Sequence, residues 1–238
     1  MQYRISLLFC VCFLLMRTGL EAQNAPTHDS WRVLLQKHVN SAGRVDYAGV
    51  KSDRARLQAY LKILADNPPR ETWRREEKMA YWINAYNAFT IELIAGHFPL
   101  KSIMDLDGGK TWDVPRIALG GKKYSLNQIE HEILRTQFQD ARIHFAINCA
   151  AKSCPPLWNK AYTAENLEKT LETRTRQFIN TPFYNDLRGN SPAVSQLFEW
   201  YAADFGNLRA FLNRYGKIKI PENARIRFKP YDWELNSQ

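Results

Sequence analysis

The segment "KMAYWINAYNAFTIELIAG", residues 78–96, decides the fold, because its apolar residues recur with the period of a helix on more than one face. Met79, Ile83 and Leu93 fall on one helical stripe, and Trp82 extends the apolar surface beyond it. A helix that is apolar nearly all round is buried in its protein. The final glycine is typical of the position just after a helix. We therefore expect the other elements to pack around this helix.

Two asparagines interrupt the apolar character of this helix. Asn84 and Asn87 are three positions apart, so they share one helical face. A buried carboxamide needs hydrogen-bond partners, and leaving one unpaired costs about 1–3 kcal/mol. The two side chains are expected either to tie neighbouring backbone in place or to line a cavity.

The flanking sequence predicts a helix-rich α+β fold with a small antiparallel sheet. "RIALGGKKYSL", residues 116–126, is typical of a hairpin that turns at its two glycines. Helices are predicted near 30–38, 52–66, 163–178, 195–205 and 207–215, and the segments 217–220 and 225–228 resemble strands. No linker or repeat divides the chain, so residues 23–238 are expected to form a single globular domain.

The first 22 residues have the pattern of a secretory signal. Arg4 precedes a predominantly apolar run of 12 residues, Ile5–Met16, and Ala22 offers a small residue for cleavage. Such a run is too short to span a bilayer, although an uncleaved anchor is the alternative. We expect an exported protein, periplasmic or secreted, with no transmembrane segment once residues 1–22 are removed.

The net charge of +9 is spread along the chain rather than gathered in one segment. A spread excess of charge indicates a solvated surface, and it gives no support for nucleic-acid binding. The expected partner is a small molecule or peptide of the cell envelope. No feature of the sequence specifies an oligomeric state.

A second informative stretch is "RIHFAINCAAKSCPPL", residues 142–157. Its first seven residues alternate as a strand would, with Ile143 and Phe145 on one face and His144 on the other. The segment is short, and we expect both of its faces to be largely buried, as in a central strand. Cys149 and Cys154 follow that strand, and they are the cysteines that remain when residues 1–22 are excluded.

Between these stretches lies a predicted helix, residues 125–138, that carries a cluster of polar side chains. Ser125 and Gln128 form an S-x-x-Q capping box at its start. His131 and Arg135 are four residues apart on one face, with Glu130 beside them. This set is either a solvated ion-pair face or a carboxylate–imidazole–guanidinium cluster directed at a site.

Several motifs together resemble the family catalogued as domain of unknown function 547, from about Val45 to Asn236. They are "YWINAYNAFTIELI", "SLNQIEHEILR", "RIHFAINCAAKSCPPL", "VSQLFEWYAADFG" and "YDWELN". The resemblance implies that the following residues are signature positions: Asn84, Tyr86, Asn87, Glu130, His131, Arg135, His144, Asn148, Cys149 and Cys154. Exported bacterial members are usual in that family, in agreement with the predicted signal.

A looser similarity is to the core of papain-like and transglutaminase-like enzymes. Those enzymes place a nucleophilic cysteine at the start of a buried helix and a histidine on a later strand. The buried helix of this chain carries Asn84 and Asn87 but no cysteine, so Cys149 would have to supply the nucleophile.

Cys149 and Cys154 admit four interpretations. An exported pair of cysteines favours a disulfide that closes a small loop. A nucleophilic Cys149 needs a histidine base with an orienting group behind it. A redox dithiol is a third interpretation, although four intervening residues are atypical. A zinc site formed by His131, His144, Cys149 and Cys154 is the fourth.

We take the nucleophile as the leading hypothesis, which predicts a thiol-dependent hydrolase or acyl transferase acting on an amide, peptide or thioester. Cys149 attacks, His131 or His144 acts as base, and Glu130 orients that base. The predicted substrate-binding residues are Asn84, Tyr86, Asn87, Arg135 and Asn148. This chemistry needs no cofactor, so none is expected, with zinc as the alternative. The competing hypothesis is a non-enzymatic envelope domain that binds a ligand or partner and contains a Cys149–Cys154 disulfide.

Overall fold

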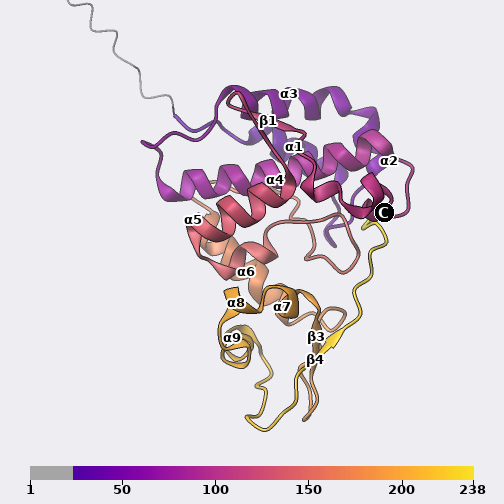
Figure 1. Ribbon diagram of the computed structural model, residues 1–238, viewed down its shortest axis with the longest axis vertical. Helices are drawn as coiled ribbons and strands as arrows, with labels where there is room; N and C mark the ends of the chain where they lie inside the picture. Colours follow the sequence, from indigo (N-terminus) through magenta and orange to yellow (C-terminus); the bar gives the residue numbers. More distant parts are fainter. Residues whose placement is uncertain (1–23) are drawn as a thin grey trace, which may run out of the picture.

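The computed structural model describes residues 24–238, and the predicted signal at 1–22 lies outside the described residues. The predicted helix-rich α+β class is confirmed. The α-helices are α1 (Asp29–His38), α2 (Tyr47–Ser52), α3 (Arg54–Asp66), α4 (Arg75–His97), α5 (Thr136–Phe138), α6 (Leu167–Ile179), α7 (Leu197–Trp200), α8 (Ala202–Phe205) and α9 (Leu208–Tyr215). Short 3-10 turns are η1 (Ile103–Asp105), η2 (Asp107–Gly109), η3 (Thr111–Asp113) and η5 (Ala141–Phe145), and η4 (Gln128–Arg135) is a π-helix. In Figure 1, α1–α4 lie at one end of the molecule and α7–α9 at the other.

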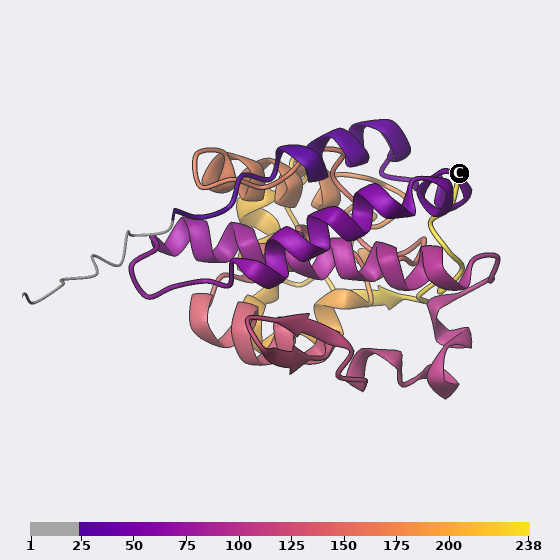
Figure 2. The ribbon, with the colours of Figure 1, turned by 90° about the horizontal axis from the view of Figure 1, so that it is seen from above.

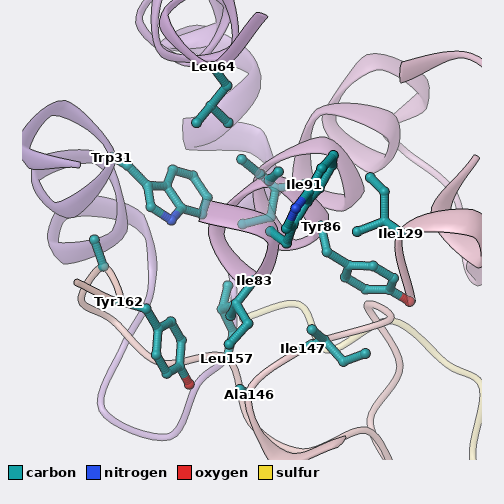
Figure 3. Close-up of a cluster of buried hydrophobic side chains, with 14 of the residues drawn as sticks. Trp31, Leu64, Ile83, Tyr86, Ile91, Ile129, Ala146, Ile147, Leu157 and Tyr162 are labelled. Carbon is teal, nitrogen blue, oxygen red and sulfur yellow. The ribbon is translucent and has the colours of Figure 1, made fainter. Parts of the chain in front are cut away.

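Helix α4 is the centre of the larger core, as the apolar segment 78–96 predicts. Buried side chains surround it, with Trp31 of α1 on one side. On the other side, Tyr86 of α4 itself lies beside Ile129 (Figure 3). Seen from above, α4 runs through the middle of the molecule beneath α3 (Figure 2). The helix continues to His97, so Gly96 lies inside it rather than after its end. A side chain at Gly96 would come within 3.1 Å of the Arg54 guanidinium, which shows how closely α3 packs there.

The strands form two small pairs. β1 (Ile117–Leu119) and β2 (Lys122–Tyr124) make the predicted antiparallel hairpin, and Gly120 and Gly121 turn it with φ of 57° and 76°. β3 (Ala193–Ser195) pairs in parallel with β4 (Arg227–Lys229). The strand predicted at 225–228 is therefore present in part, whereas 217–220 is not a strand.

The strand predicted at 142–148 is wrong, because this segment begins as the 3-10 turn η5. The Asp140 side chain accepts a hydrogen bond from the Arg142 N–H and starts the turn. Residues 143–148 are all buried, because the turn lies between two cores: Ile143 packs into the core around α4, whereas Phe145 packs into a second core that includes residues of α6 and α9. The predicted placement of His144 on the opposite strand face from Ile143 and Phe145 therefore does not apply.

The two asparagines of α4 tie irregular backbone to the helix. Asn84 donates to the Tyr162 carbonyl at 2.7 Å and accepts from the Tyr162 N–H at 3.1 Å. Asn87 donates to the Ala146 carbonyl at 2.9 Å and accepts from the Asn148 N–H at 2.8 Å. Each carboxamide thus bonds to one buried N–H and one buried carbonyl of a segment outside regular structure. In a sheet, a neighbouring strand would supply these partners.

We expect Asn84→Ala to lower the free energy of unfolding by about 3 kcal/mol, because it leaves two buried backbone groups of Tyr162 unpaired. Urea unfolding followed by circular dichroism measures the change. The matched control is Asn190→Ala at an exposed turn, which should change stability by less than about 0.5 kcal/mol. Equal stability of the two variants would show that the hydrogen bonds from Asn84 to Tyr162 do not stabilise the fold.

Candidate active site around Cys149

The π-helix η4 supplies one wall of the site. The predicted capping box is present: the Gln128 N–H donates to Ser125 Oγ at 3.1 Å, and the Ser125 N–H donates to Gln128 Oε1 at 3.0 Å. From this start Glu130 is carried into the interior, where its side chain is buried. π-Helical turns are rare and occur frequently at functional sites.

The loop after η5 holds Cys149 in a strained conformation. Ala150, the residue after the cysteine, has a φ of 66°. This is the left-handed region of the backbone, which residues other than glycine rarely adopt. Asn148 stabilises this turn, because its Oδ1 accepts from the Ala150 N–H at 2.9 Å and its Nδ2 donates to the Pro155 carbonyl at 2.8 Å. Strained residues held by such networks cluster at functional sites. Asn148 is thus a positioning residue of the cysteine loop.

Cys149 lies in a cavity of about 260 Å³ lined mainly by aromatic rings and sulfur. The lining residues are Tyr86, Trp112, Asn127, Glu130, His144, Ile147, Cys149, Cys154, Pro155, Leu197, Trp200, Tyr201, Tyr231 and Trp233. Trp200, Tyr231 and Trp233 pack on one another, with ring centroids 4.6–5.8 Å apart. A mostly apolar cavity with a few convergent polar groups is typical of a ligand site.

Both cysteines are free thiols in the structure, and their surroundings differ. The pKa of the partly exposed Cys149 is lowered, because the Cys154 thiol and the Tyr231 hydroxyl donate to its sulfur. The Cys149 sulfur and the Tyr231 oxygen are 3.2 Å apart. Burial raises the pKa of Cys154 well above its usual range. Because the thiolate is the nucleophilic form, this difference makes Cys149 rather than Cys154 the candidate nucleophile.

His144 has a carboxylate partner that sequence analysis missed. Its Nε2 lies 2.7 Å from Asp204 Oδ2, and its ring packs on Tyr201 with centroids 4.0 Å apart. Arg135 donates to both oxygens of Asp204, at 2.6 and 2.8 Å. The bond from His144, followed by those from Arg135, holds the pKa of Asp204 well below its usual range. Asp204 therefore carries a charge that fixes the ring of His144.

Glu130 and His131 have other roles than those predicted. The His131 Nδ1 lies 2.8 Å from Arg135 Nη1, and this histidine does not line the cavity. The Glu130 carboxylate bonds to the hydroxyl of Tyr201 and, after burial, is the main cause of the raised pKa of that phenol. The carboxylate that bonds to His144 is thus Asp204, whereas Glu130 is part of the cavity wall.

The structure brings together five of the predicted site residues in the cavity: Tyr86, Glu130, His144, Cys149 and Cys154. The other five are not among the lining residues: Asn87 and Asn148 bond to the segment 146–155, Arg135 bonds to Asp204 and His131, and Asn84 bonds to Tyr162. Sequence analysis missed Asp204, Tyr201, Tyr231 and the three tryptophans. All of these except Trp112 lie in the quoted motifs "VSQLFEWYAADFG" and "YDWELN", where several aromatic residues occur close together.

The structure gives no support for the alternative of a zinc site. In residues 24–238, no group of three or more His, Cys, Asp or Glu side chains is arranged to hold a metal ion. Its two proposed histidine ligands have separate partners, since His131 bonds to Arg135 and His144 to Asp204. Within the same residues, no helix is long and apolar enough to cross a membrane.

Comparison with known proteins gives one match. Residues 70–179 match the model of a family described as "Protein of unknown function, DUF547". The matched residues make up less than half of the chain, and this segment is similar to that family. No match is found among curated proteins or among solved structures. The DUF547 segment contains Glu130, His144 and Cys149, whereas Asp204 and Tyr231 lie after its end. The site is therefore built from the DUF547 segment and the C-terminal residues together.

We expect Tyr231→Phe to raise the pKa of the Cys149 thiol, because the Tyr231 hydroxyl donates a hydrogen bond to its sulfur. Alkylation by iodoacetamide should slow several-fold at pH 7, and its pH profile should shift upward, with Cys149 identified by peptide mass spectrometry. Tyr124→Phe on the hairpin is the matched control. An unchanged profile in Tyr231→Phe would show that the phenol does not act on the thiol.

We expect Asp204→Asn to lower the free energy of unfolding at pH 7 by about 2 kcal/mol, because it removes charge-assisted bonds to His144 and Arg135. The pKa of Asp204 is depressed on folding, so its stabilisation is present above the unfolded pKa of about 4 and is lost as the pH falls further. Urea unfolding between pH 7 and pH 2 should show the two proteins converging in stability. Asp29→Asn, at an exposed carboxylate, should show no such convergence.

Proposed function

We propose that the protein is a thiol-dependent hydrolase or acyl transferase acting on an amide, peptide or thioester. The observation that carries the proposal is the free thiol of Cys149, with its pKa lowered by hydrogen bonds, in the cavity that also contains His144. The Asp204 carboxylate bonded to His144 adds a candidate orienter to the candidate nucleophile and base, and these are the three groups that thiol catalysis uses.

In the proposed reaction the Cys149 thiolate attacks the acyl carbon, and a carbon–sulfur bond forms while the carbonyl oxygen becomes negative. The Tyr231 hydroxyl, which already donates to the sulfur, is the candidate donor to that oxygen. Protonated His144 gives its proton to the leaving amine, alcohol or thiol as the carbonyl reforms. Water or another acceptor then attacks the thioester, with His144 taking its proton, and releases Cys149.

Asp204 supports this cycle through the geometry of His144. Because the carboxylate bonds to Nε2, it favours the tautomer in which Nε2 carries the proton and Nδ1 is free to accept one. Asp204 also stabilises the imidazolium that forms when the base is protonated. Arg135 holds the carboxylate from the other side with two bonds, so the base is fixed by two elements, η4 and α8.

Export to the periplasm or the exterior remains part of the proposal, because it rests on residues 1–22. An oxidising compartment would favour joining Cys149 to Cys154, whose sulfur lies 3.0 Å from the Cys149 backbone nitrogen. The competing function is a non-enzymatic envelope domain with that disulfide, and the aromatic wall of Trp200, Tyr231 and Trp233 favours ligand binding without chemistry.

Hydrolysis of aryl esters, acyl thioesters and peptide anilides by the reduced protein tests the proposal. We expect Cys149→Ser to abolish turnover and His144→Gln to lower kcat by about 10²-fold or more, because the base is lost. Lys123→Gln on the exposed hairpin should retain full activity.

The competing function has its own outcome. If no thiol of the native protein reacts with a thiol reagent, and Cys149→Ser and Cys154→Ser lose equal stability, the two cysteines form a structural disulfide. That result, with no turnover of any acyl substrate by the reduced protein, would contradict the enzyme.

A further inference from the structure

A second and larger cavity lies on the other side of the cysteine loop, with a volume of about 890 Å³. It shares Cys154 and Pro155 with the cavity of Cys149, so the loop 148–156 separates the two. Its walls come from residues 41–44, from the loop 151–160 and from α6 with the segment 181–184. We call it the cationic groove, after five basic side chains in its lining: Arg44, Lys152, Lys160, Lys169 and Arg174.

The charge of the cationic groove is unbalanced. No Asp or Glu stands among its lining residues. Lys152 pairs with Glu234, and within residues 24–238 no carboxylate makes an ion pair with the other four cations. The acidic residues of α6 are engaged elsewhere, since Glu168 bonds to Arg142 and Glu172 to Arg176. A hollow lined by one sign of charge concentrates ligands of the opposite sign.

Arg174 is the most constrained of these cations. Its guanidinium donates to the Pro156 carbonyl and to Gln177 Oε1 at 2.9 Å, and its Nε is buried without a hydrogen-bond partner. Arg44 and Arg174 both act on the phenol of Tyr184, where their charge opposes the rise in pKa that burial causes. Both arginines line the cationic groove although they lie far apart in sequence.

The remaining lining shows which anion fits best. Phe183 exposes 59% of its surface beside the cations, and the amide groups of Asn159 and Gln177 are also at the wall. An apolar ring and carboxamides match the side chains and backbone of a peptide, but nothing in a simple polyphosphate. Trp158 and Tyr184 already pack on Tyr162 and Phe178, so they do not form the successive stacking platform that single-stranded nucleic acid requires.

We propose that the cationic groove binds an acidic peptide segment in extended form, with its carboxylates paired to Arg44, Lys160, Lys169 and Arg174. The site is distinct from the cavity of Cys149 and goes beyond the proposed acyl-transfer function. Where both hold, the groove is a second contact for a peptide substrate or partner, on the opposite side of the loop that carries the thiol.

Fluorescence anisotropy with labelled octaglutamate tests this site in the full chain, with octaglutamine and octalysine as comparison peptides. We expect octaglutamate alone to bind, and to bind less tightly as salt rises from about 50 to about 200 mM. The combined substitutions Arg44→Gln, Lys160→Gln and Lys169→Gln should weaken binding by about 10-fold, since three exposed ion pairs are lost.

The matched control removes three cations elsewhere: Lys62→Gln on α3 and Lys122→Gln with Lys123→Gln on the hairpin. It changes the net charge equally, so an equal loss of binding would overturn the site. Tighter binding of polyphosphate, oligothymidylate or anionic phospholipid vesicles, lost with the three groove substitutions, would overturn the assignment to a peptide. Thermal melting followed by circular dichroism checks that both triple variants are folded. The assay involves no thiol chemistry, so its failure would leave the proposed acyl transfer standing.

Discussion

The bonds between the Asn87 carboxamide and the backbone of Ala146 and Asn148 are the constraint on which the site depends. The segment after η5 has no strand beside it, so its buried N–H and carbonyl groups would otherwise lack partners. Asn87 supplies both from within the central helix α4. Asn148 makes similar bonds to the next part of the loop. Its carboxamide bonds to the N–H of Ala150 and to the carbonyl of Pro155, both of which follow Cys149 in the chain. Two side-chain amides thus transmit the rigidity of a buried helix to a strained loop.

The same loop brings distant parts of the chain together. Asn236 donates to the Ala150 carbonyl through its N–H and to the Asn148 side chain, so the C-terminal segment is anchored directly behind Cys149. That anchoring places the Tyr231 hydroxyl 3.2 Å from the sulfur and brings Trp233 into the lining of the same cavity. On another side α8 brings Asp204 to His144, and Arg135 of η4 binds the same carboxylate. A cysteine and a histidine close in sequence therefore become a site only through residues at least sixty positions further along.

The electrostatics on the two sides of the cysteine loop have opposite sign. On the cavity side, the lining contains the carboxyl group of Glu130 and no Lys or Arg. Tyr231 and Cys154 donate hydrogen bonds to the Cys149 sulfur and lower the pKa of its thiol. On the groove side, five cations stand without a carboxylate in the wall. The overall charge of +9 is therefore not evenly distributed on the folded surface, although it is evenly distributed along the sequence. A ligand that meets both sides would present carboxylates to one and a neutral acyl group to the other.

Local sequence was sufficient for the features that depend on neighbouring residues: the buried helix α4, the hairpin at Gly120-Gly121, the Ser125–Gln128 capping box and the candidate set Glu130, His144 and Cys149. Hydrophobic periodicity and turn chemistry act over a few residues, so they can be recognised without the fold. The alternation of residues 142–148 gave the wrong element, because a 3-10 turn between two cores buries residues on both sides as a central strand does. Only the tertiary structure decided that Asp204 rather than Glu130 orients the histidine, that the asparagines hold backbone, and that scattered lysines and arginines face one groove. Those pairings depend on contacts across large sequence separations, which packing creates and no local pattern records.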